Sequence, residues 1–144
     1  MKGIDYMRQH LGQQQDRDRD ALIAWLRSES RNGDISIDPS ITSWCAGAMN
    51  AAERQAGNDG TGLLNAQSFK TYGTQVTNFK DAEEGDIVIF HFPFDNDWQG
   101  HVTYFERFND DNTVTCLGGN QNHSVNESNY VSDYIVAIRR PSES

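Results

Sequence analysis

A cysteine lies at the expected start of a helix in the segment Ile41–Gly57, which reads ITSWCAGAMNAAERQAG. Thr42 or Ser43 is the expected N-cap, because a hydroxyl there can accept hydrogen bonds from the free N–H groups of the first turn. Gly57 is expected to end the helix. The positive end of the peptide dipoles favours a thiolate at Cys45. The same N–H groups could later bind an oxyanion, so Cys45 is the candidate nucleophile.

A nucleophilic thiolate needs a base, which is most often a histidine. His101 is the candidate, because it follows a glycine and opens an expected strand at 101–108. A side chain at the start of a strand is held firmly and can still reach a cleft. His10 and His123 are expected at the surface, and His91 is expected to be a core or edge residue of an apolar strand.

The base in turn needs a group that orients it. If a hairpin places Arg107 opposite Thr113, the same ladder brings His101 opposite position 119 or 120. Opposite residues lie about 4.5–5.5 Å apart at Cβ. The side-chain carbonyl of Asn120 could then accept from one imidazole nitrogen and turn the other toward the thiol. A turn residue after two glycines is the alternative interpretation of Asn120.

The second cysteine, Cys116, alternates with Val114 along an expected strand and should point into the core. A disulfide between Cys45 and Cys116 would remove the proposed nucleophile. Two cysteines are too few for a disulfide framework, so both are expected to be reduced thiols of a cytoplasmic product.

The elements expected around these residues fall into two halves. Apolar spacing and terminal glycines predict helices near 4–12, 21–30, 41–57 and 65–73. Segments rich in β-branched and aromatic residues, bounded by turn residues, predict strands at 85–92, 101–108, 113–119 and 133–140. We therefore predict an α+β fold, with N-terminal helices packed on a C-terminal antiparallel meander.

Composition excludes several classes of protein. The formal net charge of −9 argues against nucleic acid and anionic membranes as partners. No apolar run approaches the roughly 18 residues of a membrane span, and the first residues do not resemble a signal peptide. We expect a monomer with a single catalytic domain over 1–144, in which 1–40 form a helical part and 41–141 the Cys–His core.

Three features follow one another in this chain: a cysteine at a helix start, Gly-His at the start of a strand, and a polar residue at the end of the next strand. This order resembles that of the CHAP and NlpC/P60 superfamily of papain-like cysteine peptidases and amidases. A phage-associated branch of this superfamily is similar in several segments of the chain. These segments are SWCAGAMNAAERQAG, EEGDIVIFHF, GHVTYFE, and CLGGNQNHSVNESNY with IVAIRRP. The resemblance runs from about Ile41 to Pro141. It implies a papain-like NlpC/P60-type fold, with Cys45 as nucleophile, His101 as base and later acid, and Asn120 as the orienting residue.

Two positions depart from the family pattern. Many CHAP domains have glutamate where this chain has Gly118, and glutamine where it has Trp44. An acidic third residue is therefore absent, and the oxyanion hole would use backbone N–H groups, with Gln121 as a second donor. Trp44, Trp98 and Tyr104 are candidates for lining the substrate groove, with core packing as the alternative.

Some relatives bind calcium, and this chain has residues that could do so, although turn chemistry explains them equally well. We expect no metal and no other cofactor. The residues considered are Asn32, Asp34, Asp38, Asp95 and Asp97.

The resemblance implies a peptidoglycan hydrolase that cleaves an amide bond of the bacterial cell wall, as an endopeptidase or an N-acetylmuramoyl-L-alanine amidase. Without a signal peptide, the expected setting is a phage endolysin, made in the host cytoplasm and released by a holin into the periplasm or cell wall. A type VI secretion amidase effector is the alternative enzyme. The alternative that is not an enzyme is a catalytically silent wall-binding or virion structural module.

Overall fold

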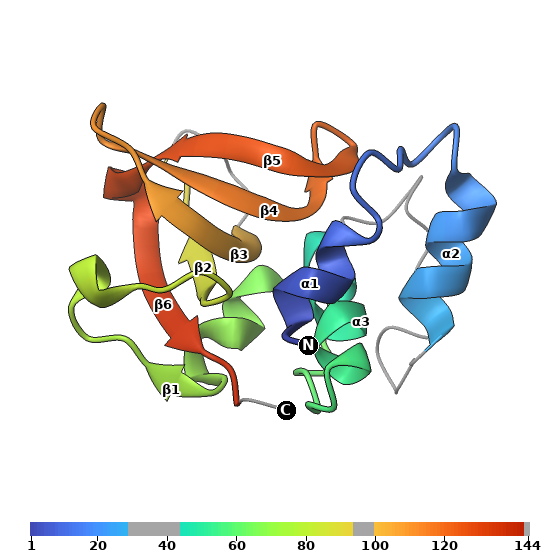
Figure 1. Ribbon diagram of the computed structural model, residues 1–144, viewed down its shortest axis with the longest axis horizontal. Helices are drawn as coiled ribbons and strands as arrows, with labels where there is room; N and C mark the ends of the chain where they lie inside the picture. The colour runs from blue at the N-terminus through green and yellow to red at the C-terminus, as the bar shows by residue number, and fades with distance from the viewer. Residues whose placement is uncertain (29–43, 94–99, 143–144) are drawn as a thin grey trace.

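A computed structural model describes residues 1–28, 44–93 and 100–142. Within these residues the fold is α+β, with a six-stranded antiparallel sheet and the helices α1, α2 and α3 gathered on one side of it (Figure 1). No helix in the described part of the chain is long and apolar enough to cross a bilayer. The helices are α1 (Gly3–Arg8), α2 (Arg19–Ser28) and α3 (Cys45–Gln55), with 3₁₀ turns η2 (Ala66–Thr71), η3 (Phe79–Asp81) and η4 (Ser132–Tyr134).

The strand order is β1-β6-β2-β3-β4-β5, and every neighbouring pair is antiparallel. The strands β2, β3 and β4 follow one another as predicted for a meander, and β5, which the sequence does not predict, continues it. The prediction of a meander is wrong for the last strand, because β6 pairs with β2 and β1 and not with β4. The sheet is strongly twisted, and β6 crosses the direction of β4 and β5 in Figure 1. The strands are β1 (Thr74–Gln75), β2 (Ile87–Phe90), β3 (His101–Phe108), β4 (Thr113–Gln121), β5 (Ser124–Val131) and β6 (Ile135–Arg140).

The predicted alignment of β3 with β4 is wrong at the hairpin end. Arg107 pairs with Thr115 and not with Thr113. A bulge at Glu106 then shifts the register by one residue, since Phe105 pairs with Cys116. A bulge places two residues of one strand against one of its partner. Toward the beginning of β3, the register of the two strands is therefore close to the predicted one.

The helix α3 packs very closely against the sheet because its side chains are small. Every residue from Cys45 to Arg54 is buried. At the contact with β4, a Cβ on Gly119 would lie 2.7 Å from Ala48 Cβ and 2.8 Å from the Trp44 ring. Such a contact is too short for any real Cβ, so a glycine at this position allows the helix start to approach the sheet.

A second core fills the opposite face of the sheet. It contains Val88 and Phe90 of β2, Phe105 of β3, and Val114 and Cys116 of β4. The prediction that Cys116 is a core residue is confirmed, since its thiol is completely buried and free. Burial raises the pKa of this thiol well above its usual range, and the nearby Glu106 adds to the rise. Cys116 is therefore an unreactive thiol.

A buried carboxylate joins α3 to the sheet. Glu53 is completely buried and accepts hydrogen bonds from Tyr104 Oη at 2.6 Å, Tyr72 Oη at 2.8 Å and Asn58 Nδ2 at 3.1 Å. Burial raises the pKa of Glu53, although these three hydrogen bonds oppose the rise. Because a buried polar group is costly without partners, these bonds fix the rotation of α3 about its axis.

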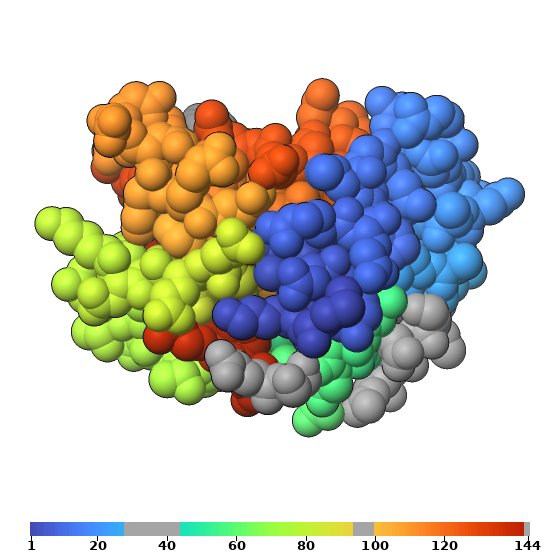
Figure 2. Space-filling model, viewed as in Figure 1, coloured from blue at the N-terminus to red at the C-terminus, as the bar shows by residue number. Residues whose placement is uncertain are grey.

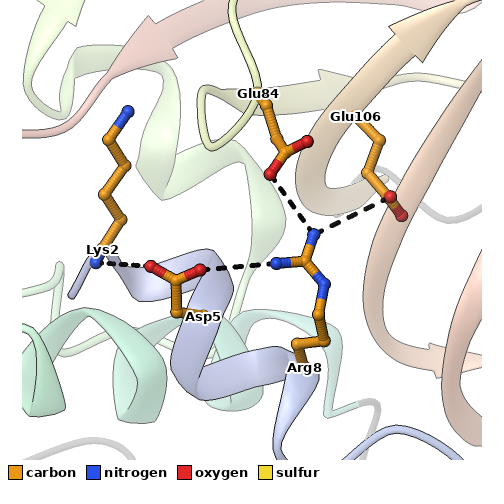
Figure 3. A network of polar contacts seen from close by, with 5 residues as sticks. All are labelled: Lys2, Asp5, Arg8, Glu84 and Glu106. Carbon is orange, nitrogen blue, oxygen red and sulfur yellow. Dashed lines mark hydrogen bonds and ion pairs between the residues drawn. The ribbon is translucent and has the colours of Figure 1, made fainter.

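The helix α1 is anchored by Arg8, which bridges three carboxylates (Figure 3). Its guanidinium lies 3.4 Å from Asp5 Oδ1, 3.5 Å from Glu84 Oε1 and 3.8 Å from Glu106 Oε2. Figure 2 shows the blue N-terminal segment seated directly against the orange β3–β4 region. Exposed ion pairs contribute little to stability, but the Glu106 side chain is only 8% exposed, so this contact is partly shielded from water.

Candidate active site

The nucleophile candidate occupies the first position of α3, as predicted. The N-cap is Trp44, whose carbonyl accepts from Ala48 N at 2.9 Å. The prediction of Thr42 or Ser43 as N-cap is therefore wrong in position; both residues lie outside the described part of the chain. The first backbone N–H groups of a helix have no partner within the helix, so Cys45 lies beside donors that no carbonyl of α3 uses.

The base candidate opens β3, also as predicted. His101 pairs with Phe90 of β2 and is 9% exposed. The preceding Gly100 has φ 69°, and a Cβ there would overlap Phe90 O and Gln67 Nε2. Only glycine tolerates both the left-handed backbone and this close approach. The imidazole therefore lies at the end of the sheet, where the start of α3 can reach it.

The structure brings Cys45 and His101 together. Burial alone would lower the pKa of His101, but a hydrogen bond to Cys45 and the charge interaction with it, aided by Gln121, raise this pKa. The charge interaction is mutual, because an imidazolium that the thiolate stabilises also stabilises the thiolate. The pair is suited to exist as thiolate and imidazolium.

The residue that orients His101 is Gln121. Its Oε1 lies 3.0 Å from His101 Nε2, and its side chain is 2% exposed. The amide nitrogen donates to Cys116 O at 3.2 Å and Asn126 O at 2.7 Å. Because both amide protons face carbonyl groups, the amide oxygen must face the imidazole and accept from Nε2–H. This tautomer leaves Nδ1 without a proton and available to the Cys45 thiol.

The prediction of Asn120 as the orienting residue is thus corrected by one position. The pairing of β4 with β5 shifts between Gly118 and Gln121, and Asn120 within this bulge has φ 56°. A shift of one residue exchanges the two faces of a strand. The role expected at position 120 therefore falls to its neighbour. Two glycines followed by asparagine, which tolerates a left-handed backbone, were the signal of a bulge in the sequence.

A further residue at the imidazole was missed by the sequence analysis. Tyr130 Oη lies 3.3 Å from His101 Nε2, and the two ring centroids are 5.3 Å apart. Tyr130 belongs to β5, which was not predicted as a strand. Phe90 covers the imidazole from another side, with ring centroids 6.4 Å apart. The base therefore has aromatic neighbours that exclude water.

The residues predicted to contact substrate are mostly structural. Trp44 is completely buried, and its Nε1 donates to Gln15 Oε1 at 3.0 Å, so it supports the helix start and cannot line an open groove. Tyr104 is completely buried in the core. Gln121 is not a second oxyanion donor, because its amide protons are already used. Trp98 lies outside the described residues.

The described residues hold no group of three or more His, Cys, Asp or Glu side chains that could bind a metal ion. The alternative calcium ligands all lie outside the described part of the chain. They are Asn32, Asp34, Asp38, Asp95 and Asp97.

No protein-family model matches the chain, and no curated protein is significantly similar to it. The chemistry of the molecule is therefore inferred from the site itself. Its distinguishing feature is an imidazole that is hydrogen-bonded both to a thiol at a helix start and to a fixed side-chain amide.

Proposed function

We propose that the protein is a papain-like cysteine hydrolase of the CHAP or NlpC/P60 kind, which cleaves an amide bond of bacterial peptidoglycan. The observation that carries the proposal is the contact of His101 with Cys45 on one side and Gln121 on the other. A nucleophile, its base and a group that orients the base are the parts required for covalent acyl transfer.

In the first half of the reaction, the Cys45 thiolate attacks the carbonyl carbon of the scissile amide. The carbonyl electrons move to oxygen, and free N–H groups of the first turn of α3 stabilise the resulting oxyanion. The intermediate collapses as the C–N bond breaks, and His101 gives its Nδ1 proton to the departing amine. The products of this half are a free amine and a thioester at Cys45.

In the second half, His101 is neutral and accepts a proton from water through Nδ1. The hydroxide formed attacks the thioester carbonyl, and the C–S bond breaks. A carboxylic acid leaves, and the thiolate and imidazolium are restored. Such acid–base assistance typically accelerates reactions by about 10²- to 10⁴-fold.

Gln121 contributes orientation and not charge. A neutral amide holds the Nε2 proton and so keeps Nδ1 facing the sulfur. In many CHAP domains an acidic residue occupies the position of Gly118. Here the absence of a side chain leaves room for Gln121, because a Cβ at position 118 would lie 3.2 Å from Gln121 Oε1.

The substrate is proposed from the sequence resemblance between about Ile41 and Pro141. The same residues would serve an endopeptidase acting on a stem peptide or an amidase acting on the lactyl amide. The proposed setting is a phage endolysin released through a holin. A type VI secretion amidase effector would use the same site and would be encoded beside an immunity protein, whereas an endolysin gene would lie near a holin gene.

Product analysis tests the proposed bond. Purified peptidoglycan is digested, and mass spectrometry identifies the new ends of each fragment. An amide hydrolase produces new amino and carboxyl termini in the peptide, or a separated lactyl carboxylate. New reducing sugar ends without new amino termini would contradict the proposal, because they come from cleavage of the glycan.

The alternative outside enzymes is a silent wall-binding or virion structural module. It predicts that Cys45 resists alkylation at neutral pH and that Cys45→Ala preserves function. The raised pKa of His101 favours the enzyme. Together with Gln121, the interaction with the Cys45 thiol raises this pKa more than burial lowers it, and packing of the core does not need such an interaction.

A further inference from the structure

We propose that Tyr130 is a positioning residue for His101, whose phenol oxygen is a second acceptor for the Nε2 proton and stabilises the imidazolium. The inference rests on the proposed function of Cys45 and His101, and it concerns how this site maintains its ion pair. Nothing in the sequence pattern identified Tyr130, because β5 consists mostly of polar residues.

The distances place two acceptors around one proton. His101 Nε2 lies 3.0 Å from Gln121 Oε1 and 3.3 Å from Tyr130 Oη. A single N–H shared between two acceptors is a common three-centre arrangement in proteins. The longer distance makes the phenol the weaker of the two partners, so its contribution adds to that of the amide.

The proton on Nε2 fixes the direction in which the phenol acts. Gln121 Oε1 accepts from Nε2–H, so this nitrogen carries a proton, and the Tyr130 oxygen beside it can only accept. Ser128 Oγ, which donates to Asn126 Oδ1 at 2.6 Å, is also hydrogen-bonded to the phenol.

The two acceptors are also joined to each other. Gln121 Nε2 lies 3.3 Å from Asn126 Oδ1, the same oxygen that accepts from Ser128. Asn126 Nδ2 donates to Gln121 O at 2.7 Å. Hydrogen bonds connected in this way polarise one another. The acceptors are thus held by one network on β4 and β5, and the network ends on the Nε2 proton.

Packing keeps the phenol in place and neutral. The Tyr130 ring lies 4.9 Å from the Phe90 ring and 5.8 Å from the Phe92 ring, measured between centroids. Burial raises the pKa of Tyr130 far above its usual range, and nearby thiols add to the rise, which the hydrogen bond with Ser128 only partly opposes. A phenol that stays protonated cannot replace the base, so it acts only through its dipole. Two neutral acceptors here substitute for the single acidic residue common in CHAP domains.

The variant Tyr130→Phe removes the oxygen and keeps the ring. The test follows the thiolate by its ultraviolet absorbance as a function of pH, with Cys45→Ala as the blank, and follows the His101 imidazole by NMR. An ion pair exists between the pH at which the thiol ionises and the pH at which the imidazolium loses its proton. Losing a stabiliser of the imidazolium should reduce the upper limit. The lower limit should stay in place, because the imidazolium is present both before and after the thiol ionises.

We expect the upper limit to fall by roughly 0.5 to 1 pH unit, a three- to tenfold change, as expected for one weak hydrogen bond to a charged group. The matched control is Tyr134→Phe, which removes a hydroxyl from a ring that contacts the same Phe92. The control should leave both limits unchanged. An upper limit equal to that of the wild type in folded Tyr130→Phe would overturn the inference.

If Tyr130→Phe does not fold, Ser128→Ala tests the same network. It leaves the Tyr130 ring in place and removes a hydrogen-bond partner of its phenol, so the upper limit should fall by a smaller amount. An unchanged upper limit in this variant would also overturn the inference. Both measurements need no peptidoglycan. Absence of the thiolate–imidazolium pair in the wild type would overturn the proposed function itself. If the wild type has the pair and the variants have it over the same pH range, only the role of Tyr130 is overturned.

Discussion

Gln121 Oε1 lies 3.0 Å from His101 Nε2, and the amide nitrogen of the same side chain donates to two backbone carbonyls. The amide cannot rotate without breaking both of those bonds. The histidine is therefore held in one tautomer by a residue that is itself held by the sheet. This relationship decides which nitrogen faces the thiol, and it leads to the first prediction.

Replacing Gln121 with alanine should reduce kcat/KM by about tenfold to a hundredfold, as expected for losing about 1.5–3 kcal/mol of hydrogen bonding to a charged group. Asn120→Gly is the matched control, since glycine tolerates the φ of 56° at that position. It should retain activity within a few-fold. Steady-state digestion of peptidoglycan by both variants checks this, and the reverse ranking would restore Asn120 as the orienting residue.

Gly118 should be intolerant of a side chain. A Cβ there would overlap Thr103 Oγ1 and crowd Gln121 Oε1. Gly118→Ala is expected to cost about 1–3 kcal/mol in the free energy of unfolding by overpacking, and to reduce kcat because Gln121 is displaced.

Urea unfolding and kinetics measure the two effects of Gly118→Ala. The double variant Gly118→Ala with Thr103→Ala removes the overlapping hydroxyl, which is buried without a hydrogen-bond partner in the described structure. It should regain part of the lost activity. A fully active single variant would show that the close packing at this bulge is not needed.

In the candidate site, the group that orients His101 could be predicted from sequence to within one residue, whereas Tyr130 was missed and Trp44 was wrongly expected in the groove. The reasons for these errors are local. β3 has the predicted bounds, because His101–Phe108 is rich in apolar, β-branched and aromatic residues. β5 was missed because its sequence SVNESNYV is mostly polar, and its strand character depends on pairing with β4. The bulge at Asn120 depends on the packing of Gly119 against α3. Tertiary contacts of this kind leave little trace in a single sequence.

The pH dependence of activity should follow the raised pKa of His101. Activity requires the imidazolium, so it should decline at high pH only above the ordinary histidine value of 6.5. The low-pH limit should mark ionisation of the thiol. A profile of kcat/KM from about pH 5 to about pH 9 should therefore be bell-shaped. A flat profile across this range would argue against a Cys–His pair.

Glu106 should make the stability of the fold depend on pH. Burial and the neighbouring Glu127 raise the pKa of Glu106 from 4.5 to about 7, against the opposing charges of Arg8 and Arg107. Because the folded state holds this proton more tightly than the unfolded state, the contribution of Glu106 to stability is fully present below pH 4.5. That contribution is lost as the pH rises to about 7.

Glu106→Gln should remove this part of the pH dependence. Between pH 4.5 and about 7, the stability of the variant relative to the wild type should rise with pH. Urea unfolding at several pH values measures the difference, and Glu84→Gln, at a more exposed partner of Arg8, is the control. Parallel pH curves for wild type and Glu106→Gln would contradict this account of the Glu106 pKa.

The most direct test of the proposed chemistry compares the two cysteines. Cys45 touches His101, whereas Cys116 is a buried thiol of the second core. The rate of peptidoglycan digestion is measured for wild type, Cys45→Ala and Cys116→Ala at equal concentrations of folded protein. The account predicts no release of fragments by Cys45→Ala and near wild-type release by Cys116→Ala. Equal release by wild type and Cys45→Ala would show that the sulfur at the start of α3 does not perform the reaction.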